Sequence, residues 1–257
     1  MSYCRAREDF RAFLKTIDLD KYRMLLKDKK YVEQDLPKGV VEEMLKSLYE
    51  YYWINKQFLS FDDWFNAIWS RVTKLKEFKD FIWYYWHMTL GKDEDWDEWF
   101  KVGFKARLYR TWTAVLTQFD FMYTFACVLE EKGMKMPISA SPELNAKGID
   151  LRLRVGDNLI DIQVSKVSQR KDVRGKTGKG VIVIPYPVVS RRDLVGRPNI
   201  LNIFDKYYEE LENGFIVFKK KLAEEVLNRM LRGEDVSRFT EKLAECFVGK
   251  KCELASQ

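Results

Sequence analysis

The sequence contains one histidine, His87, and four cysteines that form no Cys-x-x-Cys motif. The ligands for a zinc site are therefore too few, and catalytic triads that need a histidine base are disfavoured. Because His87 lies within the aromatic run WYYWHM, we expect its ring to be buried and packed among these aromatic side chains.

Long apolar segments are also missing from the sequence. No run approaches the roughly 18 to 20 apolar residues that a membrane-spanning helix needs. The N-terminal stretch MSYCRAREDF lacks the apolar core of a signal peptide. We therefore expect a cytoplasmic protein.

The chain does contain enough apolar residues to fold. Of its 257 residues, 46% are hydrophobic, which suffices for one large or two modest cores. All eight tryptophans fall between Trp53 and Trp112, whereas most candidate catalytic residues and the densest basic stretch come later. We expect a helical N-terminal subdomain over residues 1–103 and a second subdomain over residues 104–257. The net charge of +6 is compatible with an anionic partner.

Apolar residues spaced by three and four predict a helix that begins near Val41 and a long helix over about residues 104–131. Gly133 and Pro137 follow the long helix and are expected to end it. The same spacing predicts three later helices, with the apolar faces Ile203, Tyr207 and Leu211; Leu222, Val226 and Met230; and Phe239, Leu243 and Phe247.

After Pro137 the apolar period changes to two, which predicts strands over residues 150–155 and 160–165. The run VIVIPYPVV predicts a third strand, and Pro185 within it favours a sheet edge or an exit, because proline lacks an N–H. The expected fold class is α+β or α/β, with a small mixed sheet packed by helices.

The first two strands are separated by Gly156 and Asp157, and glycine at the first position of a two-residue loop suits a type II′ turn. This loop predicts that Asp150 lies opposite Gln163 and that Arg152 lies opposite Asp161. Three polar side chains then share one face of the sheet: Asp150, Asp161 and Gln163.

Two carboxylates that converge on one sheet face form an oxygen-rich site for a hard cation such as Mg²⁺. Bound Mg²⁺ can support phosphodiester hydrolysis without a histidine. Glu143, just upstream, is a candidate for a further carboxylate or a supporting contact. The alternative is a hairpin whose solvated face carries ordinary charges.

A basic, glycine-containing loop, KVSQRKDVRGKTGKG, follows the second strand. Its cations can neutralise phosphates, and arginine and lysine also read guanine in the major groove. Beside carboxylates that repel DNA, this loop is expected to act as a clamp. The candidate DNA-binding residues are Arg170, Lys171, Arg174, Lys176 and Lys179.

In these residues the sequence resembles the PD-(D/E)xK nucleases, whose signature is an Asp at the start of one strand and acid-x-Lys on the next. Asp150 and Asp161 match the two acids, which the resemblance implies are metal ligands. Ile149 replaces the signature proline, and Gln163 replaces the lysine. Lys166 lies three residues further on, and only a bulge would turn it towards the acids. Either Gln163 or Lys166 therefore fills the third catalytic position.

More narrowly, the chain resembles the Taq-type type II restriction endonucleases in its length and in the stretches YVEQDLP, GID and QVSKVS. The resemblance implies Mg²⁺-dependent cleavage of double-stranded DNA at a short palindrome, TCGA in that family. It also implies a methyltransferase that protects the host DNA, and it allows for a homodimer. Glu33 and Asp35 in YVEQDLP are interpreted as part of a turn between helices.

Two other functions are compatible with the sequence. One is a different nuclease of the same fold, in DNA repair or phage defence, which would use the same catalytic residues. The other is a DNA-binding module without catalysis, in which Asp150 and Asp161 only form ion pairs with Arg152 and Arg154.

Overall fold

The computed structural model describes residues 2–26, 36–88, 95–167, 180–248, 252 and 254. The chain forms two compact units, one of residues 17–116 and one that combines residues 1–16 with residues 117–257. We call them the helical unit and the sheet unit. The long helix α6, Trp96–Glu131, contributes residues to both.

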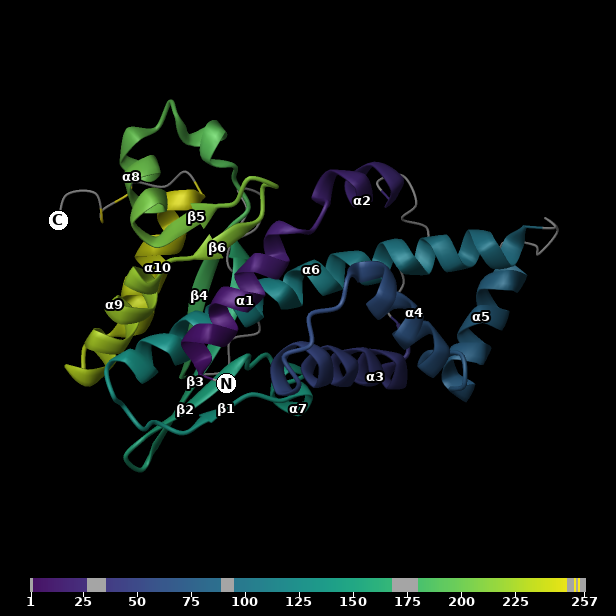
Figure 1. Cartoon of the computed structure of the whole chain (residues 1–257), viewed down its shortest axis with the longest axis horizontal. Coiled ribbons are helices and arrows are strands. Elements are labelled where there is room, and N and C mark those ends of the chain that lie inside the picture. The colour runs from purple at the N-terminus through teal and green to yellow at the C-terminus, as the bar shows by residue number, and fades with distance from the viewer. Residues whose placement is uncertain are drawn as a thin grey trace. The chain divides into compact units, whose positions relative to one another are not determined.

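The helical unit consists of helices (Figure 1). Many of its buried side chains are aromatic. Its elements are α2 (Leu19–Leu26), α3 (Lys38–Leu48), the π-helix η1 (Tyr49–Ile54), α4 (Phe61–Val72), α5 (Lys76–Met88) and the first part of α6. In the core, Trp112 Nε1 donates a hydrogen bond to the Tyr52 hydroxyl at 2.9 Å, and Trp64 Nε1 donates to Ser47 Oγ at 3.1 Å. Much of the tryptophan-rich segment thus serves as core, with its polar ring atoms satisfied.

The expectation that His87 is buried is wrong. Its ring is exposed on α5 and lies against exposed Trp83 in a tilted arrangement, with 3.7 Å between the ring centroids. The residues of α5 that enter the core are Phe78 and Tyr85, seven apart on another face of the helix.

The sheet unit contains a four-stranded sheet, a separate two-stranded ribbon and surrounding helices. Its elements are α1 (Tyr3–Lys15), β1 (Ile138–Ser139), α7 (Pro142–Asn145), β2 (Leu151–Val155), β3 (Asn158–Val167), β4 (Val181–Pro187), η2 (Arg191–Leu194), α8 (Pro198–Tyr207), β5 (Tyr208–Glu210), β6 (Ile216–Phe218), α9 (Lys220–Leu231) and α10 (Val236–Phe247). The larger sheet has the order β1-β2-β3-β4, with antiparallel pairs except for the parallel pair β3-β4. The expected α+β fold with a small mixed sheet is confirmed.

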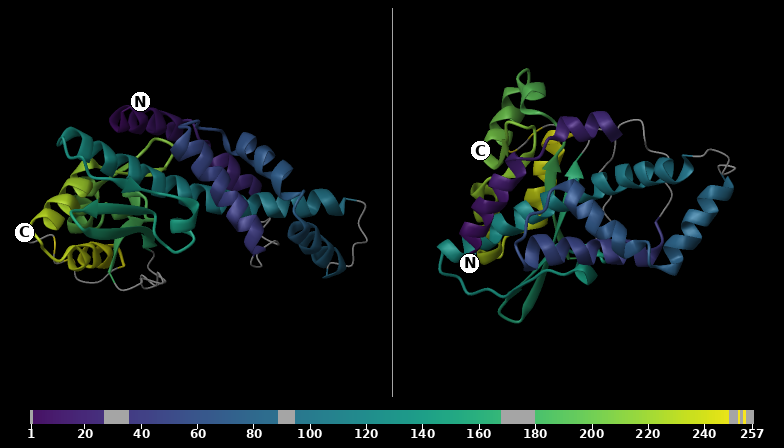
Figure 2. Two further views of the ribbon diagram at one scale, coloured as in Figure 1. Left: turned by 90° about the horizontal axis from the view of Figure 1, so that it is seen from below. Right: turned by 45° about the vertical axis from the view of Figure 1, so that its right-hand side comes forward.

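Strand β4 is the edge strand that Pro185 predicts. Pro185 pairs with Ser165 of β3, and β4 is the last strand of the sheet among the described residues. Helix α10 packs against β4, and α9 lies beside α10, as both views in Figure 2 show.

Two helix predictions need correction. Helix α6 ends at Glu131 and is followed by Gly133 at φ 64°, as expected, but it begins at Trp96 rather than near residue 104. Its first turns carry a row of stacked rings. The ring centroid of Phe100 lies 5.4 Å from that of Trp96 and 6.2 Å from that of Phe104. This aromatic row continues the packed face of the helix towards its N-terminus.

The second correction concerns Leu211, which the periodicity assigns to a helix. Helix α8 ends at Tyr207, and the chain continues as the hairpin β5-β6. Asn213 and Gly214 form the turn, where Gly214 has a φ of 80°. This Asn-Gly pair is the local signal for a hairpin and outweighs the helical spacing of the apolar residues.

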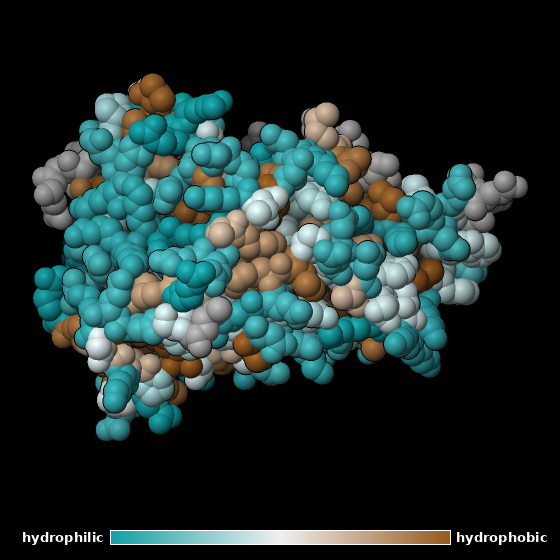
Figure 3. Space-filling view, viewed as in Figure 1, coloured by the Kyte–Doolittle hydropathy of each residue, from teal (hydrophilic) through white to brown (hydrophobic). Residues whose placement is uncertain are grey.

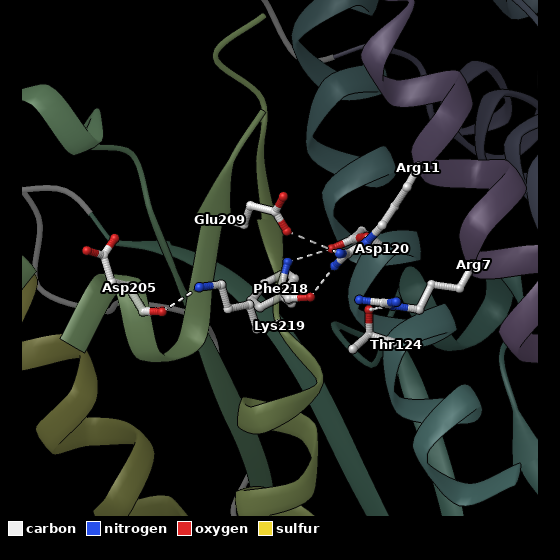
Figure 4. A network of polar contacts seen from close by, with 8 residues as sticks. All are labelled: Arg7, Arg11, Asp120, Thr124, Asp205, Glu209, Phe218 and Lys219. Atoms are coloured by element: carbon white, nitrogen blue, oxygen red, sulfur yellow. Dashed lines mark hydrogen bonds and ion pairs between the residues drawn. The ribbon is translucent and has the colours of Figure 1, made fainter. Parts of the chain in front are cut away.

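A buried polar network fixes α1 within the sheet unit (Figure 4). Asp120 of α6 is fully buried and accepts hydrogen bonds from Arg11 Nε at 3.1 Å and from the Phe218 N–H at 2.7 Å. Arg11 also donates to the Phe218 carbonyl and pairs with Glu209 at 3.6 Å. The disulfide between Cys4 and Cys127 joins α1 to α6 as well, and a second one links Cys246 to Cys252. Neither disulfide was predicted from the cysteine spacing.

The outer surface is mainly polar on the face drawn in Figure 3, where hydrophobic residues gather only in small scattered groups. Among the described residues, no helix has the length and apolar character needed to cross a membrane.

Candidate active site

The turn of the β2-β3 hairpin has the predicted geometry. Val155 pairs with Asn158 across the two-residue loop, and Gly156 has a φ of 60° while Asp157 keeps a negative φ. A positive φ at the first loop position alone corresponds to the type II′ turn. The predicted register therefore holds along β2, and Arg152 lies opposite Asp161.

Asp161 forms a two-pronged ion pair with Arg152. The Arg152 Nε and Nη2 atoms donate to the two carboxylate oxygens of Asp161 at 2.6 and 2.9 Å. Both side chains are partly exposed, 31% for Arg152 and 21% for Asp161. The nearby carboxylate raises the pKa of the Arg152 guanidinium above its usual value. This pair is the arrangement expected if the hairpin carries ordinary charges, but solvent can still reach it.

Asp150 does not follow the strand alternation. Its N–H donates to the Ile162 carbonyl at 2.9 Å, while the register pairs Ile162 with Leu151. Two successive residues thus oppose one, which is the pattern of a β-bulge. Ile149, Asp150 and Leu151 are all buried. A position for Asp150 on the same face as Asp161 therefore does not follow from simple alternation.

The Asp150 carboxylate is 2% exposed and is held by two protein donors. Asn145 Nδ2 donates to Oδ1 at 2.8 Å, and the Val164 N–H donates to Oδ2 at 2.6 Å. Beyond the last β2-β3 pair, Oδ2 takes the place of a strand carbonyl as the acceptor. Burial raises the pKa of Asp150 to about 7, although the hydrogen bond from Val164 opposes this shift.

Gln163 lies two residues after Asp161 on β3 and packs over Gly148. Gly148 has a φ of 79°, and a Cβ at this position would lie 3.3 Å from Gln163 Nε2. Glycine is thus required both by its backbone conformation and by the close approach of the amide. The Oε1 atom of Gln163 is buried and has no hydrogen-bond partner. Such an oxygen is rare in proteins and is suited to an added donor or cation.

Lys166 lies on the other face of β3. The β3-β4 ladder pairs residues one to one from Asp161 to Val167, so no bulge interrupts it. Lys166 therefore shares the face of Ile162 and Val164, and it is exposed. The placement favours Gln163 over Lys166 for the third position.

The remaining candidates are less closely associated with the hairpin. Glu143 is exposed on the short helix α7. Among the described residues, one group of three potential metal ligands has its ligand atoms within 4.8 Å of one another: Cys4, Cys127 and Glu131. The two sulfur atoms of this group are joined in a disulfide. The basic residues Arg170, Lys171, Arg174, Lys176 and Lys179 lie outside the described residues, as do Glu33 and Asp35.

Asn145 was not singled out from the sequence. It is the last residue of α7, whose first turn is capped by Ser141, and its amide Nδ2 bridges Asp150 Oδ1 and Gln118 Oε1, the latter at 3.1 Å. It thereby fixes the orientation of the buried carboxylate. The serine followed by proline in SPELN is the sequence signal for this short helix.

The oxygen atoms of the hairpin suit a hard divalent cation. Asp161 and Asp150 supply carboxylates, and Gln163 supplies a carbonyl oxygen that lacks a protein partner. Oxygen ligands of these types are the ones that Mg²⁺ and Ca²⁺ prefer. By residue type, these oxygens are ones that could hold a cation for the activation of water near a phosphodiester.

Comparison with known proteins gives a consistent family assignment. The sequence model of the family described as TaqI restriction endonuclease matches residues 7–230. The type II restriction enzyme TaqI of Thermus aquaticus is 30% identical over 244 residues, covering 86% of this chain and 87% of that protein. The type II restriction enzyme TthHB8I of Thermus thermophilus is 28% identical over 243 residues, covering 86% of each. No solved structure matches the chain.

Proposed function

Because the chain belongs to the TaqI restriction endonuclease family, we propose that it cleaves double-stranded DNA at a short palindrome in a Mg²⁺-dependent reaction. Family membership makes the chain a restriction endonuclease, an enzyme that hydrolyses phosphodiester bonds of DNA. The finer parts of the proposal are Mg²⁺ as the metal and TCGA as the palindrome.

The buried, unpartnered Oε1 of Gln163 is the observation that carries the proposed site. It lies on β3 two residues after Asp161, on the same side of the strand. An ordinary solvated hairpin has no reason to bury an amide oxygen without a donor. We therefore assign Asp161 and Asp150 as metal ligands and Gln163 as the residue that orients the attacking water.

Each of these residues has a defined task in the reaction. Bound Mg²⁺ supplies a Lewis acid that polarises the phosphate and lowers the pKa of a bound water. Asp161 would hold the cation in place of its ion pair with Arg152, and the guanidinium would then be available to a phosphate oxygen. Asp150 would hold the cation as a carboxylate, that is, in its deprotonated form. Gln163 does not titrate, so it holds the water by hydrogen bonds and cannot act as a base.

The wider proposal covers the fold and the partners. A nuclease core of the PD-(D/E)xK type is expected within residues 104–257 and a helical subdomain within residues 1–103, whereas the compact units divide the chain after residues 16 and 116. The basic residues from Arg170 to Lys179 clamp the DNA, while Glu143 supports the site. A homodimer would match the symmetry of a palindrome, and a separate methyltransferase would protect host DNA.

The second candidate is a member of this family that has lost catalysis and acts only as a DNA-binding module, and the Arg152–Asp161 ion pair is the observation that favours it. Digestion of a plasmid of known sequence, with Mg²⁺ and with EDTA, separates the candidates. We expect discrete fragments that end at TCGA and appear only with Mg²⁺. Random fragments would indicate a nuclease without sequence specificity, and intact plasmid would support the binding module.

A further inference from the structure

The helical unit contains an open pocket of about 350 Å³ between residues of α2, α4 and α6. Its polar lining consists of Lys21, Tyr22, Asp62, Asn66, Glu98, Lys101 and Lys105. Three lysines thus meet two carboxylates in one concave site. All of these residues belong to the helical unit, whereas the β2-β3 hairpin belongs to the sheet unit.

Asp62 is fully engaged by two neighbours. The Tyr22 hydroxyl donates to Asp62 Oδ2 at 2.7 Å, and Lys105 Nζ donates to Oδ1 at 2.5 Å. Although partial burial works against it, these hydrogen bonds hold the pKa of Asp62 below its usual value. The carboxylate of Asp62 therefore forms its direct ion pair with Lys105, and Lys21 is a more distant cation that also lowers the pKa of Asp62.

In the described residues, Lys101 and Lys21 each lie over an aromatic ring and not in an ion pair. The Lys101 ammonium lies 5.7 Å from the ring centre of Trp69, and that of Lys21 lies 5.4 Å from the ring centre of Tyr22. In the described part of the chain neither ammonium forms an ion pair with a carboxylate. An aromatic face attracts a cation and orients it without cancelling its charge. Both ammonium groups thus remain available to an anion in the pocket.

We propose that this pocket binds a phosphate group through Lys101 and Lys21, with Lys105 as a third cation, and that the phosphate belongs to the backbone of DNA. The choice of DNA as the source rests on the proposed function, whereas the phosphate chemistry rests on the pocket itself. A volume of about 350 Å³ lies near the lower end of the roughly 300–1,000 Å³ typical of ligand sites. The pocket therefore accommodates a phosphate and its sugar rather than a large cofactor. Glu98, on the same helix as Lys101, opposes the anion and limits its affinity.

The test compares two pairs of variants by their binding of a TCGA duplex in EDTA, where Mg²⁺-dependent cleavage is blocked. Lys101→Met keeps an apolar stem against Trp69, and Lys79→Met removes the same charge from an exposed position on α5. We expect Lys101→Met alone to weaken binding and to reduce the slope of log affinity against log salt by about 0.9, the value for one phosphate. Glu98→Gln should tighten binding more than Asp80→Asn, its matched control on α5.

A second arm identifies the source of the phosphate. Thymidine 5′-phosphate and inorganic phosphate are titrated calorimetrically against the wild type and Lys101→Met. Loss of this binding in Lys101→Met with an unchanged DNA slope would keep the phosphate site but overturn DNA as its source. The phosphate site would be overturned if Lys101→Met bound DNA and phosphate like the wild type and Glu98→Gln did not change the DNA affinity. Neither arm measures cleavage. The binding results therefore remain interpretable even if the proposed cleavage activity is not found.

Discussion

Asp150 and Asp161 lie on paired segments of one hairpin, yet they occupy contrasting environments. Asp161 is partly exposed and faces a flexible arginine, which holds it by two hydrogen bonds. Asp150 is buried and held by the Asn145 amide and by the backbone of Val164. One carboxylate is thus neutralised by a side chain that can move, and the other is fixed by groups that cannot easily leave.

This difference means that a cation must displace a different group at each carboxylate. At Asp161 it competes with a guanidinium, which is always charged and can rotate away into solvent. At Asp150 it competes with a proton near neutral pH, because burial raises the pKa of this carboxyl to about 7. The two ligands should therefore respond differently to substitution and to pH.

The largest expected effect on cleavage comes from removal of the negative charge of Asp150 or of Asp161. We expect Asp150→Asn and Asp161→Asn each to reduce cleavage by more than about 100-fold, since loss of a mere supporting residue costs about 10–100-fold. DNA binding should persist or tighten, because anionic repulsion falls. Single-turnover cleavage and DNA binding in EDTA check this, with Asp157→Asn in the exposed turn as the control. Full Mg²⁺-dependent cleavage by either variant would refute the site.

The next effect distinguishes the two faces of β3. Gln163→Ala should slow single-turnover cleavage by roughly 10–100-fold, as expected for a residue that supports the metal site, whereas Lys166→Ala should stay near the wild-type rate. The reason is that the unbroken β3-β4 ladder places Lys166 on the opposite face. A nearly normal Gln163→Ala beside an inactive Lys166→Ala would reverse the assignment. Thermal unfolding of both variants serves as the control for folding.

The turn half of the hairpin could be predicted because its rules are local. Gly156 fixes the turn, and the turn fixes the pairing of Arg152 with Asp161. The position of Asp150 could not be predicted in the same way. It depends on a bulge and on Asn145, whose helix contacts Gln118 across a sequence distance of 27 residues.

The same distinction explains the outcome for the rest of the fold. Long periodic segments predicted α6 and the sheet strands, while the β5-β6 hairpin required weighing Asn213 and Gly214 against helical spacing. The disulfide from Cys4 to Cys127 spans 123 residues, and no local sequence pattern predicts such a contact.

A smaller effect is expected from Asn145, which contacts the carboxylate of Asp150 and the amide of Gln118. Asn145→Ala should lower activity about tenfold, the lower end of the range for a residue that orients a metal ligand. Its activity should recover as Mg²⁺ is raised, because the defect lies in the position of Asp150 and not in the reaction itself. Asn199→Ala, at an exposed position on α8, is the matched control. A purely structural role would instead lower thermal stability without changing the Mg²⁺ dependence.

The smallest expected effect is on the free energy of unfolding in the absence of metal. It reports on the buried carboxyl group of Asp150 alone. The pKa of Asp150 is raised to about 7 in the folded chain, against roughly 3.9 for an unfolded aspartate. Between these values the folded chain retains a proton that the unfolded chain loses, so its contribution to stability is present at low pH and is lost as pH rises through about 7. In EDTA, the free energy of unfolding of the wild type should therefore fall from pH 4 to pH 8 more steeply than that of Asp150→Asn, by at most about 1.4 kcal/mol per unit of the pKa difference. Denaturant unfolding checks this, and Asp157→Asn should keep the wild-type slope. Equal slopes in wild type and Asp150→Asn would show that the buried carboxyl holds no proton near neutral pH, and the contrast with Asp161 would then reduce to the mobility of their partners.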